Sequence, residues 1–142
     1  MTPASTALAL GAAFSILAAI AHLACIAIGP SAYRLLGAGE RMARAVEAGM
    51  LQPTLVTLAI AVMLLAWGVY ALSAAGLVRR MPLTKVALIG ITAVYLGRAV
   101  LFPFLRPMFP ENSMTFWLVS SGICLGIGLL HAFGVASRWN DL

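Results

Sequence analysis

Long apolar runs alternate with short polar breaks along this chain. Four runs stand out, at residues 4–28, 48–78, 86–105 and 114–137, and only the third carries a charged residue deep inside it. Each run is about as long as the roughly 20 residues that a helix needs to cross a bilayer core of about 30 Å. The pattern predicts an all-α integral membrane protein, a four-helix transmembrane bundle that forms a single domain over residues 1–142.

Glycine, proline and basic residues mark the breaks between these runs. Gly29 and Pro30 end the first run, Arg79 and Arg80 end the second, and three prolines follow the third within residues 103–110. Between the first two runs, residues 31–49 alternate arginine and glutamate with apolar side chains. This pattern predicts a short amphipathic segment that lies on the membrane surface.

Composition supports lipid as the solvent of this chain. Apolar residues make up 63% of the sequence, charged residues 9%, and the mean hydropathy is +1.03. The net charge of +5 comes from nine Lys and Arg residues that are scattered at the ends of the runs rather than gathered in a stripe. They indicate contact with the bilayer surface and argue against a nucleic-acid partner. Trp117 and Trp139, at the two ends of the last run, are predicted to be interfacial anchors.

The basic loops predict an orientation. Arg79, Arg80 and Lys85 form the tightest basic loop and have no acidic neighbour, so we place them and both termini in the cytoplasm. Three arginines of the segment before the second run oppose this assignment, at positions 34, 41 and 44. The short, alanine-rich chain favours a bacterial inner membrane.

Small and polar residues recur at helical spacing within two of the runs. Such residues let helices approach closely and hydrogen-bond in lipid, so they predict inward faces. These faces hold Gly11, Ser15, Ala18 and His22 in the first run, and Ser121, Cys124, Gly128 and His131 in the fourth. Gly122 and Gly126 form a GxxxG pair on another side of the fourth helix, which suggests packing within the bundle or a homo-oligomer.

Arg98 is the strongest candidate for a functional residue, because a charge inside a span is costly unless it is paired or reaches the interface. At a rise of about 1.5 Å per residue, His22 lies at a depth similar to that of Arg98. Glu47 and Glu40 are placed on the same side as acids that can pair with Arg98, and Tyr95 lies one turn before it. The predicted ligand-binding set is His22, Glu40, Arg44, Glu47, Tyr95 and Arg98, with Arg41 also at its mouth.

Two interpretations of this set stay open. Glutamate or histidine as proton acceptor and arginine as anion holder allow acid–base chemistry on a bound ligand. In the alternative, an ion pair of Arg98 with Glu47 holds the bundle together and His22 bonds to a carbonyl group. Two histidines in different leaflets do not make up a metal site, and no motif specifies a cofactor or a reaction.

The stretch Arg41-Met-Ala-Arg44-Ala-Val-Glu47, followed by Pro53, resembles the membrane-associated eicosanoid and glutathione metabolism family. The resemblance covers about a dozen residues, and the Asn that the family carries between the second Arg and the Glu is missing here. It implies a trimeric four-helix membrane enzyme of glutathione or lipid metabolism. Glutathione would then be held by Arg44 and Glu47.

Three functions therefore compete. The first is binding of a lipid-like or lipophilic anionic molecule in a pocket near one leaflet, with or without its chemical conversion. The second is a non-catalytic structural or helper subunit of a membrane complex, and the third, a proton-coupled transporter, lacks an acid in mid-span. The pocket hypothesis requires a cavity of roughly 300 Å³ or more that reaches Arg98, whereas the helper hypothesis requires a fully paired Arg98 and no such cavity.

Overall fold

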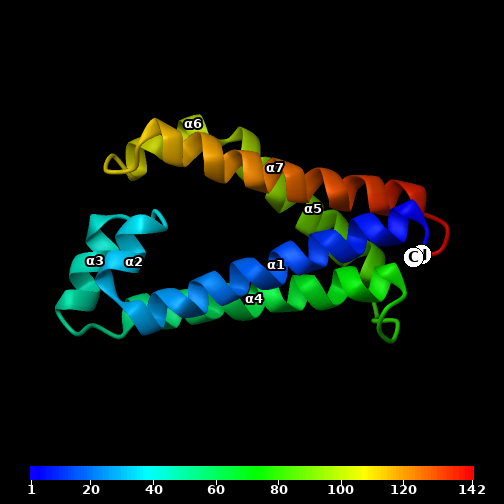
Figure 1. Cartoon of the computed structure of the whole chain (residues 1–142), viewed down its shortest axis with the longest axis horizontal. Helices are drawn as coiled ribbons and strands as arrows, with labels where there is room; N and C mark the ends of the chain where they lie inside the picture. The colour runs from blue at the N-terminus through cyan, green and yellow to red at the C-terminus, as the bar shows by residue number, and fades with distance from the viewer.

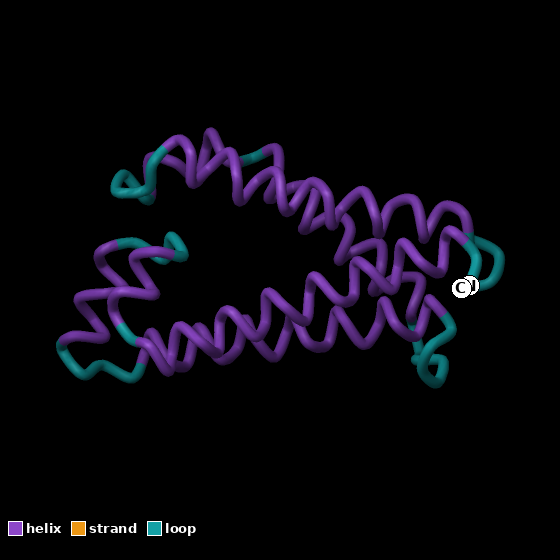
Figure 2. Tube along the Cα trace, viewed as in Figure 1, coloured by secondary structure: helices purple, strands orange, loops and turns teal.

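The computed structural model describes all 142 residues, and the chain is helical apart from short loops and turns (Figure 2). No strand is present. In chain order the elements are α1 (Pro3–Ile28), α2 (Pro30–Leu35), α3 (Glu40–Glu47), α4 (Gln52–Ala75), α5 (Thr84–Val100), α6 (Phe102–Leu105), the 3₁₀ turn η1 (Arg106–Met108) and α7 (Met114–Ser137). The prediction of an all-α chain is confirmed.

Capping residues and glycines explain where the long helices begin and end. The Thr2 hydroxyl accepts a hydrogen bond from the Ser5 amide at 3.2 Å, and the Ser113 hydroxyl accepts one from the Phe116 amide at 3.1 Å. Gly76 closes α4 in the left-handed conformation, with φ of 81°. α4 runs from Gln52 to Ala75 and is therefore shorter than the predicted run of residues 48–78.

Three helices, α1, α4 and α7, are each long and apolar enough to cross a membrane. The third predicted run differs from a straight span, because α5 stops at Val100 and the chain continues into α6 and η1 at an angle of 67°. Pro103 explains the break, since proline removes a backbone donor and clashes with the preceding turn. If this bent pair crosses as one unit, the chain has four spans. The fold is thus compatible with a multi-pass membrane protein.

The long helices are arranged in two pairs. α1 lies beside α4, α5 lies beside α7, and a contact between α1 and α7 joins the pairs. Figure 1 shows the pairs close together at the end where both termini lie and diverging toward α2 and α3. The helical hairpin α2–α3, between α1 and α4 in the chain, therefore stands at the open end of the molecule.

The predicted inward faces lie where the two pairs meet. Gly11 and Ser15 of α1 are buried, as are Gly128 and His131 of α7. The Ser15 and Tyr95 hydroxyls are 2.8 Å apart and link α1 to α5. Gly122 and Gly126, by contrast, lie on the exposed side of α7. Ser121 is buried as well, whereas Ala18, His22 and Cys124 are half-buried. The spacing of small residues along α1 and α7 therefore predicted most of the buried faces.

Candidate ligand pocket

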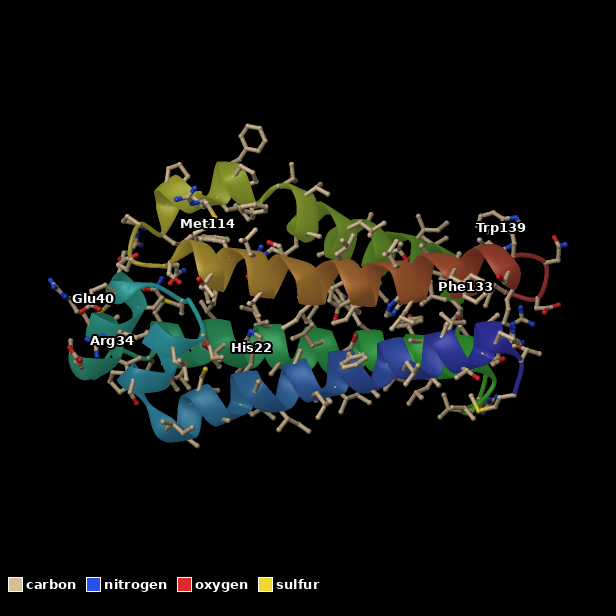
Figure 3. All side chains as sticks on the ribbon, turned by 45° about the horizontal axis from the view of Figure 1, so that its top comes forward. His22, Arg34, Glu40, Met114, Phe133 and Trp139 are labelled. Atoms are coloured by element: carbon tan, nitrogen blue, oxygen red, sulfur yellow. The ribbon has the colours of Figure 1, made fainter.

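A cavity of about 950 Å³ lies between the two helix pairs at their open end. In Figure 3, this end carries Arg34, Glu40 and Met114, while Phe133 and Trp139 lie at the opposite end. The walls come from α1, from the end of α2, from α5, from the bent segment after α5 and from the first turns of α7. The polar groups of the wall include His22, Arg34, Arg98, Glu111, Asn112, Ser113, Thr115 and Ser120.

Arg98 of α5 is half-buried and lines the cavity. Its Nη2 donates a hydrogen bond to the Ser120 hydroxyl at 3.2 Å, and its Nη1 donates one to the Ser121 hydroxyl at 3.3 Å. The guanidinium lies over the ring of Trp117 with its Cζ 5.0 Å from the ring centroid, a cation–π geometry. No carboxylate oxygen forms an ion pair with it within 4.0 Å. The positive charge of Arg98 is therefore solvated by neutral groups only.

The acids expected beside Arg98 pair with Arg34 instead. The Arg34 guanidinium reaches both Glu40 oxygens, at 2.8 and 3.0 Å, and one Glu47 oxygen at 2.8 Å. Arg44 adds a bond of 3.2 Å to Glu40. These arginines lower the pKa of Glu40 to about 2, and the two glutamates raise the pKa of Arg34. Pairing of Arg98 with Glu47 or Glu40 is therefore not found.

His22 of α1 lies in the cavity wall, as its predicted depth required. Its Nδ1 is 2.7 Å from the carbonyl oxygen of Ala18, so this nitrogen carries the proton. The other ring nitrogen, Nε2, makes no hydrogen bond within the protein. Of the predicted set, His22 and Arg98 line the cavity. Arg34 and Glu111 were not in that set and line it as well.

Tyr95 does not line the cavity, although it lies on the same helix as Arg98. Its side chain is buried, with 5% of its surface exposed, and its ring packs against Trp67 and His131 at centroid distances of 5.4 and 5.6 Å. The hydroxyl contacts Ser15. Tyr95 is thus a core residue that connects three helices below the pocket.

The mouth of the cavity is crossed by contacts between the α2–α3 hairpin and the loop before α7. The Asn112 side-chain amide donates a hydrogen bond to the Gly37 carbonyl at 3.0 Å. A Glu111 oxygen accepts one from the Glu40 amide at 3.2 Å. A Cβ at Gly37 would lie 2.0 Å from the Phe116 ring, so glycine is needed here for the ring to approach. None of these contacts has a signature in the sequence.

Trp117 corrects one prediction. It is 3% exposed, and its ring lies between Arg98 and the rings of Phe102, Phe109 and Phe116, so it is a buried wall residue and not an interfacial anchor. Trp139 at the other end is 47% exposed and lies under the Lys85 ammonium. Position at an end of the last apolar run predicted the same role for both tryptophans, but the bent segment after α5 covers only Trp117.

Comparison with known proteins adds no relative: no family model, no curated protein and no solved structure matches this chain. The site must therefore be interpreted from its own residues. No group of three or more His, Cys, Asp and Glu side chains is placed to hold a metal ion. Arg44 and Glu47, to which the resemblance assigned glutathione binding, are engaged in the hairpin and do not line the cavity.

Proposed function

We propose that this chain is a small four-span membrane protein that binds a lipophilic, anionic small molecule in the cavity around Arg98. The observation that carries the proposal is the lone positive charge of Arg98 facing a cavity of about 950 Å³. This volume is at the upper end of the range of small-molecule sites, about 300–1,000 Å³. It also exceeds the roughly 300 Å³ that the pocket hypothesis requires.

The wall of the cavity has the mixture of groups that an amphiphile needs. Arg98 offers N–H donors, His22 adds a ring nitrogen without a protein partner, and the remaining surface includes Leu35, Leu36, Leu105, Phe109, Phe116, Val119 and Ile123. A charge held among apolar groups is costly without a partner, and a bound anion lowers that cost. The cavity supports binding of a small molecule, and it does not indicate a chemical conversion of that molecule.

The membrane and its orientation are part of this proposal. Large apolar side chains cover the outer faces of α1, α4 and α7, a surface suited to lipid. We place the end with Arg79, Arg80, Lys85 and both termini in the cytoplasm of a bacterial cell, so that the pocket opens toward the outer leaflet of the inner membrane. Cysteine labelling from outside the cell at Arg41→Cys, with Arg79→Cys as the inaccessible control, tests this orientation.

A second candidate function is that of a self-associating or partner-binding subunit. A Cβ at Gly122 or Gly126 would meet no atom within 4 Å, so this GxxxG face of α7 is open to another helix. Such a face is compatible with a homo-oligomer and does not exclude a ligand in the cavity. Measuring the mass of the detergent-solubilised complex distinguishes a monomer from an oligomer.

Native mass spectrometry of the gently extracted protein tests the binding proposal. We expect a co-purified small molecule on the wild type and on the control Arg79→Gln, whose side chain is exposed and distant from the cavity. Arg98→Gln should lose this molecule. Val119→Trp, which adds bulk to the cavity wall at a position 57% exposed, should lose it without removing a charge. Equal retention by all four proteins would overturn the proposal.

A further inference from the structure

The charges around the cavity narrow the class of ligand. Arg34 and Arg98 are the two permanent cations in the wall, but Arg34 is already bound by Glu40 and Glu47. Glu111 adds a carboxylate to the same wall. One permanent cation without a carboxylate partner therefore faces the ligand, and a second negative charge on the ligand would be repelled by Glu111. The wall suits a monoanion.

The free donors of Arg98 suit an anion that offers two oxygens. A guanidinium has five N–H donors, and two of these are used by Ser120 and Ser121. The remaining donors include one on each terminal nitrogen and one on Nε, which is enough for a bidentate pair with a carboxylate. Because the serine bonds are long, at 3.2 and 3.3 Å, they compete weakly with a charge-assisted bond.

The depth of Arg98 argues against a large polar headgroup. Its partners Ser120 and Ser121 lie six and seven residues after Met114, about 9 to 10 Å along α7 at a rise of 1.5 Å per residue. A phospholipid headgroup placed there would bury its ester and terminal groups as well as its phosphate. Each buried polar group without a hydrogen-bond partner costs free energy. A carboxylate has no further polar atoms to satisfy.

The apolar part of the wall leads sideways out of the protein. Val119 and Ile123 of α7 line the cavity and are also 57% and 56% exposed. The cavity wall on α7 runs from Thr115 to Ile123, about 12 Å, which is close to the thickness of one leaflet of a bilayer core of about 30 Å. A single hydrocarbon chain can therefore leave the cavity between the helix pairs and enter the surrounding leaflet.

From these four observations we infer that the ligand is a long-chain carboxylic acid, with its carboxylate on Arg98 and a single hydrocarbon chain that exits past Val119 and Ile123. This inference rests on the proposed function, because it assigns a chemical class to the molecule in the same cavity. Arg98 is therefore the residue that recognises the anion.

The test is equilibrium binding of a radiolabelled 16-carbon carboxylate to delipidated protein in nanodiscs of phosphatidylcholine. Unlabelled competitors are the same acid, its methyl ester, the 16-carbon phosphate monoester and a single-chain phosphocholine. We expect the ester to compete about 10- to 100-fold more weakly than the acid, since it loses hydrogen bonds to a charged group. Both phosphate compounds should compete at least about tenfold more weakly.

The variants distinguish failure of the inferred ligand class from failure of the pocket proposal. Arg98→Gln should reduce the affinity for the acid to that for the ester, whereas Arg79→Gln should leave both unchanged. If binding depends on Arg98 but a phosphate compound competes as well as the acid, the ligand class is wrong and the pocket stands. If no probe binds, or if Arg98→Gln binds the acid as wild type does, the pocket proposal fails as well. The comparison of acid with ester on the wild type remains decisive if Arg98→Gln does not fold.

Discussion

One buried and one exposed glycine of α7 allow a direct test of how the two helix pairs meet. A Cβ at Gly134 would lie 2.4, 2.8 and 3.0 Å from Cγ, Cδ2 and Cδ1 of Leu8, a residue with no exposed surface. Leu8 belongs to α1 and cannot move into free space. At Gly126, two turns earlier on the same helix, a Cβ would meet no atom within 4 Å. The two positions therefore differ in packing and share the same helical backbone.

The expected change in unfolding free energy is the sum of two opposing contributions. Alanine is favoured over glycine in a helix interior by about 1 kcal/mol, which applies at both positions. Overpacking a core costs about 1–3 kcal/mol, which applies only at Gly134. We expect Gly134→Ala to be destabilised relative to Gly126→Ala by about 1–3 kcal/mol. Gly126→Ala itself should match the wild type or exceed its free energy of unfolding by up to about 1 kcal/mol.

Reversible unfolding by SDS in mixed micelles, followed by circular dichroism, measures these free energies. The arrangement of α1 against α7 would be refuted if Gly134→Ala were as stable as Gly126→Ala. A loss of stability in Gly126→Ala that disappears on dilution has a different meaning, because dilution separates subunits. That result would place the GxxxG face in an interface between copies of the chain.

Three further changes probe the hairpin, the core and the mouth. Because Arg34 lowers the pKa of Glu40 from 4.5 to about 2, the melting-temperature advantage of wild type over Glu40→Gln should be full above pH 4.5 and lost as the pH falls through about 2. Tyr95→Phe leaves the buried Ser15 hydroxyl without its partner and should cost about 1–3 kcal/mol in unfolding free energy. Asn112→Ala removes one bond across the mouth and should speed ligand release about 2- to 10-fold, measured by exchange of the labelled acid.

Tyr95→Phe and Asn112→Ala each have a matched control variant, and Glu40→Gln is checked by its pH dependence. Tyr70→Phe removes a hydroxyl that bonds to no protein group and should leave the unfolding free energy unchanged within about 0.5 kcal/mol. Asn140→Ala alters an exposed amide at the opposite end and should not change ligand release. Equal effects of test and control would show that the Tyr95 hydroxyl and the Asn112 amide do not act as described. A melting-temperature difference that persists at pH 2 would contradict the role of Glu40.

The sequence predicted the helices and most of their buried faces because helices that are long and apolar enough to cross a membrane have a simple pattern. Uncharged runs of about 20 residues and small residues at helical spacing need no knowledge of tertiary structure. The shared depth of His22 and Arg98 followed from the rise per residue alone, and both residues line the cavity. The bend after Val100 was visible only as a proline and not as an angle, since a local breaker does not specify the direction of the next segment.

The partners of Arg98 could not be predicted, because they depend on which helices are neighbours. Depth along the helices is compatible with either Glu47 or Ser121 as a partner of Arg98. Depth does not define how a helix is rotated about its axis or which helices are neighbours. The structure places α5 against α7, so the Ser121 hydroxyl contacts Arg98, while the hairpin brings Glu47 to Arg34. Arg34, in α2, was assigned to a surface segment, and its ion pairs with residues 6 and 13 positions away have no periodic signature.

The surroundings of Arg98 favour a binding role over a purely structural one. A structural arginine inside a span is stabilised best by a carboxylate, yet all three acids at this end bond elsewhere: Glu40 and Glu47 to Arg34, and Glu111 to the Glu40 amide. Serine hydroxyls and an aromatic face stabilise a guanidinium less than an ion pair does. The guanidinium of Arg98, which has no carboxylate partner, faces a cavity whose wall includes apolar side chains. An anion with a hydrocarbon chain would neutralise this charge and contact the apolar part of the wall.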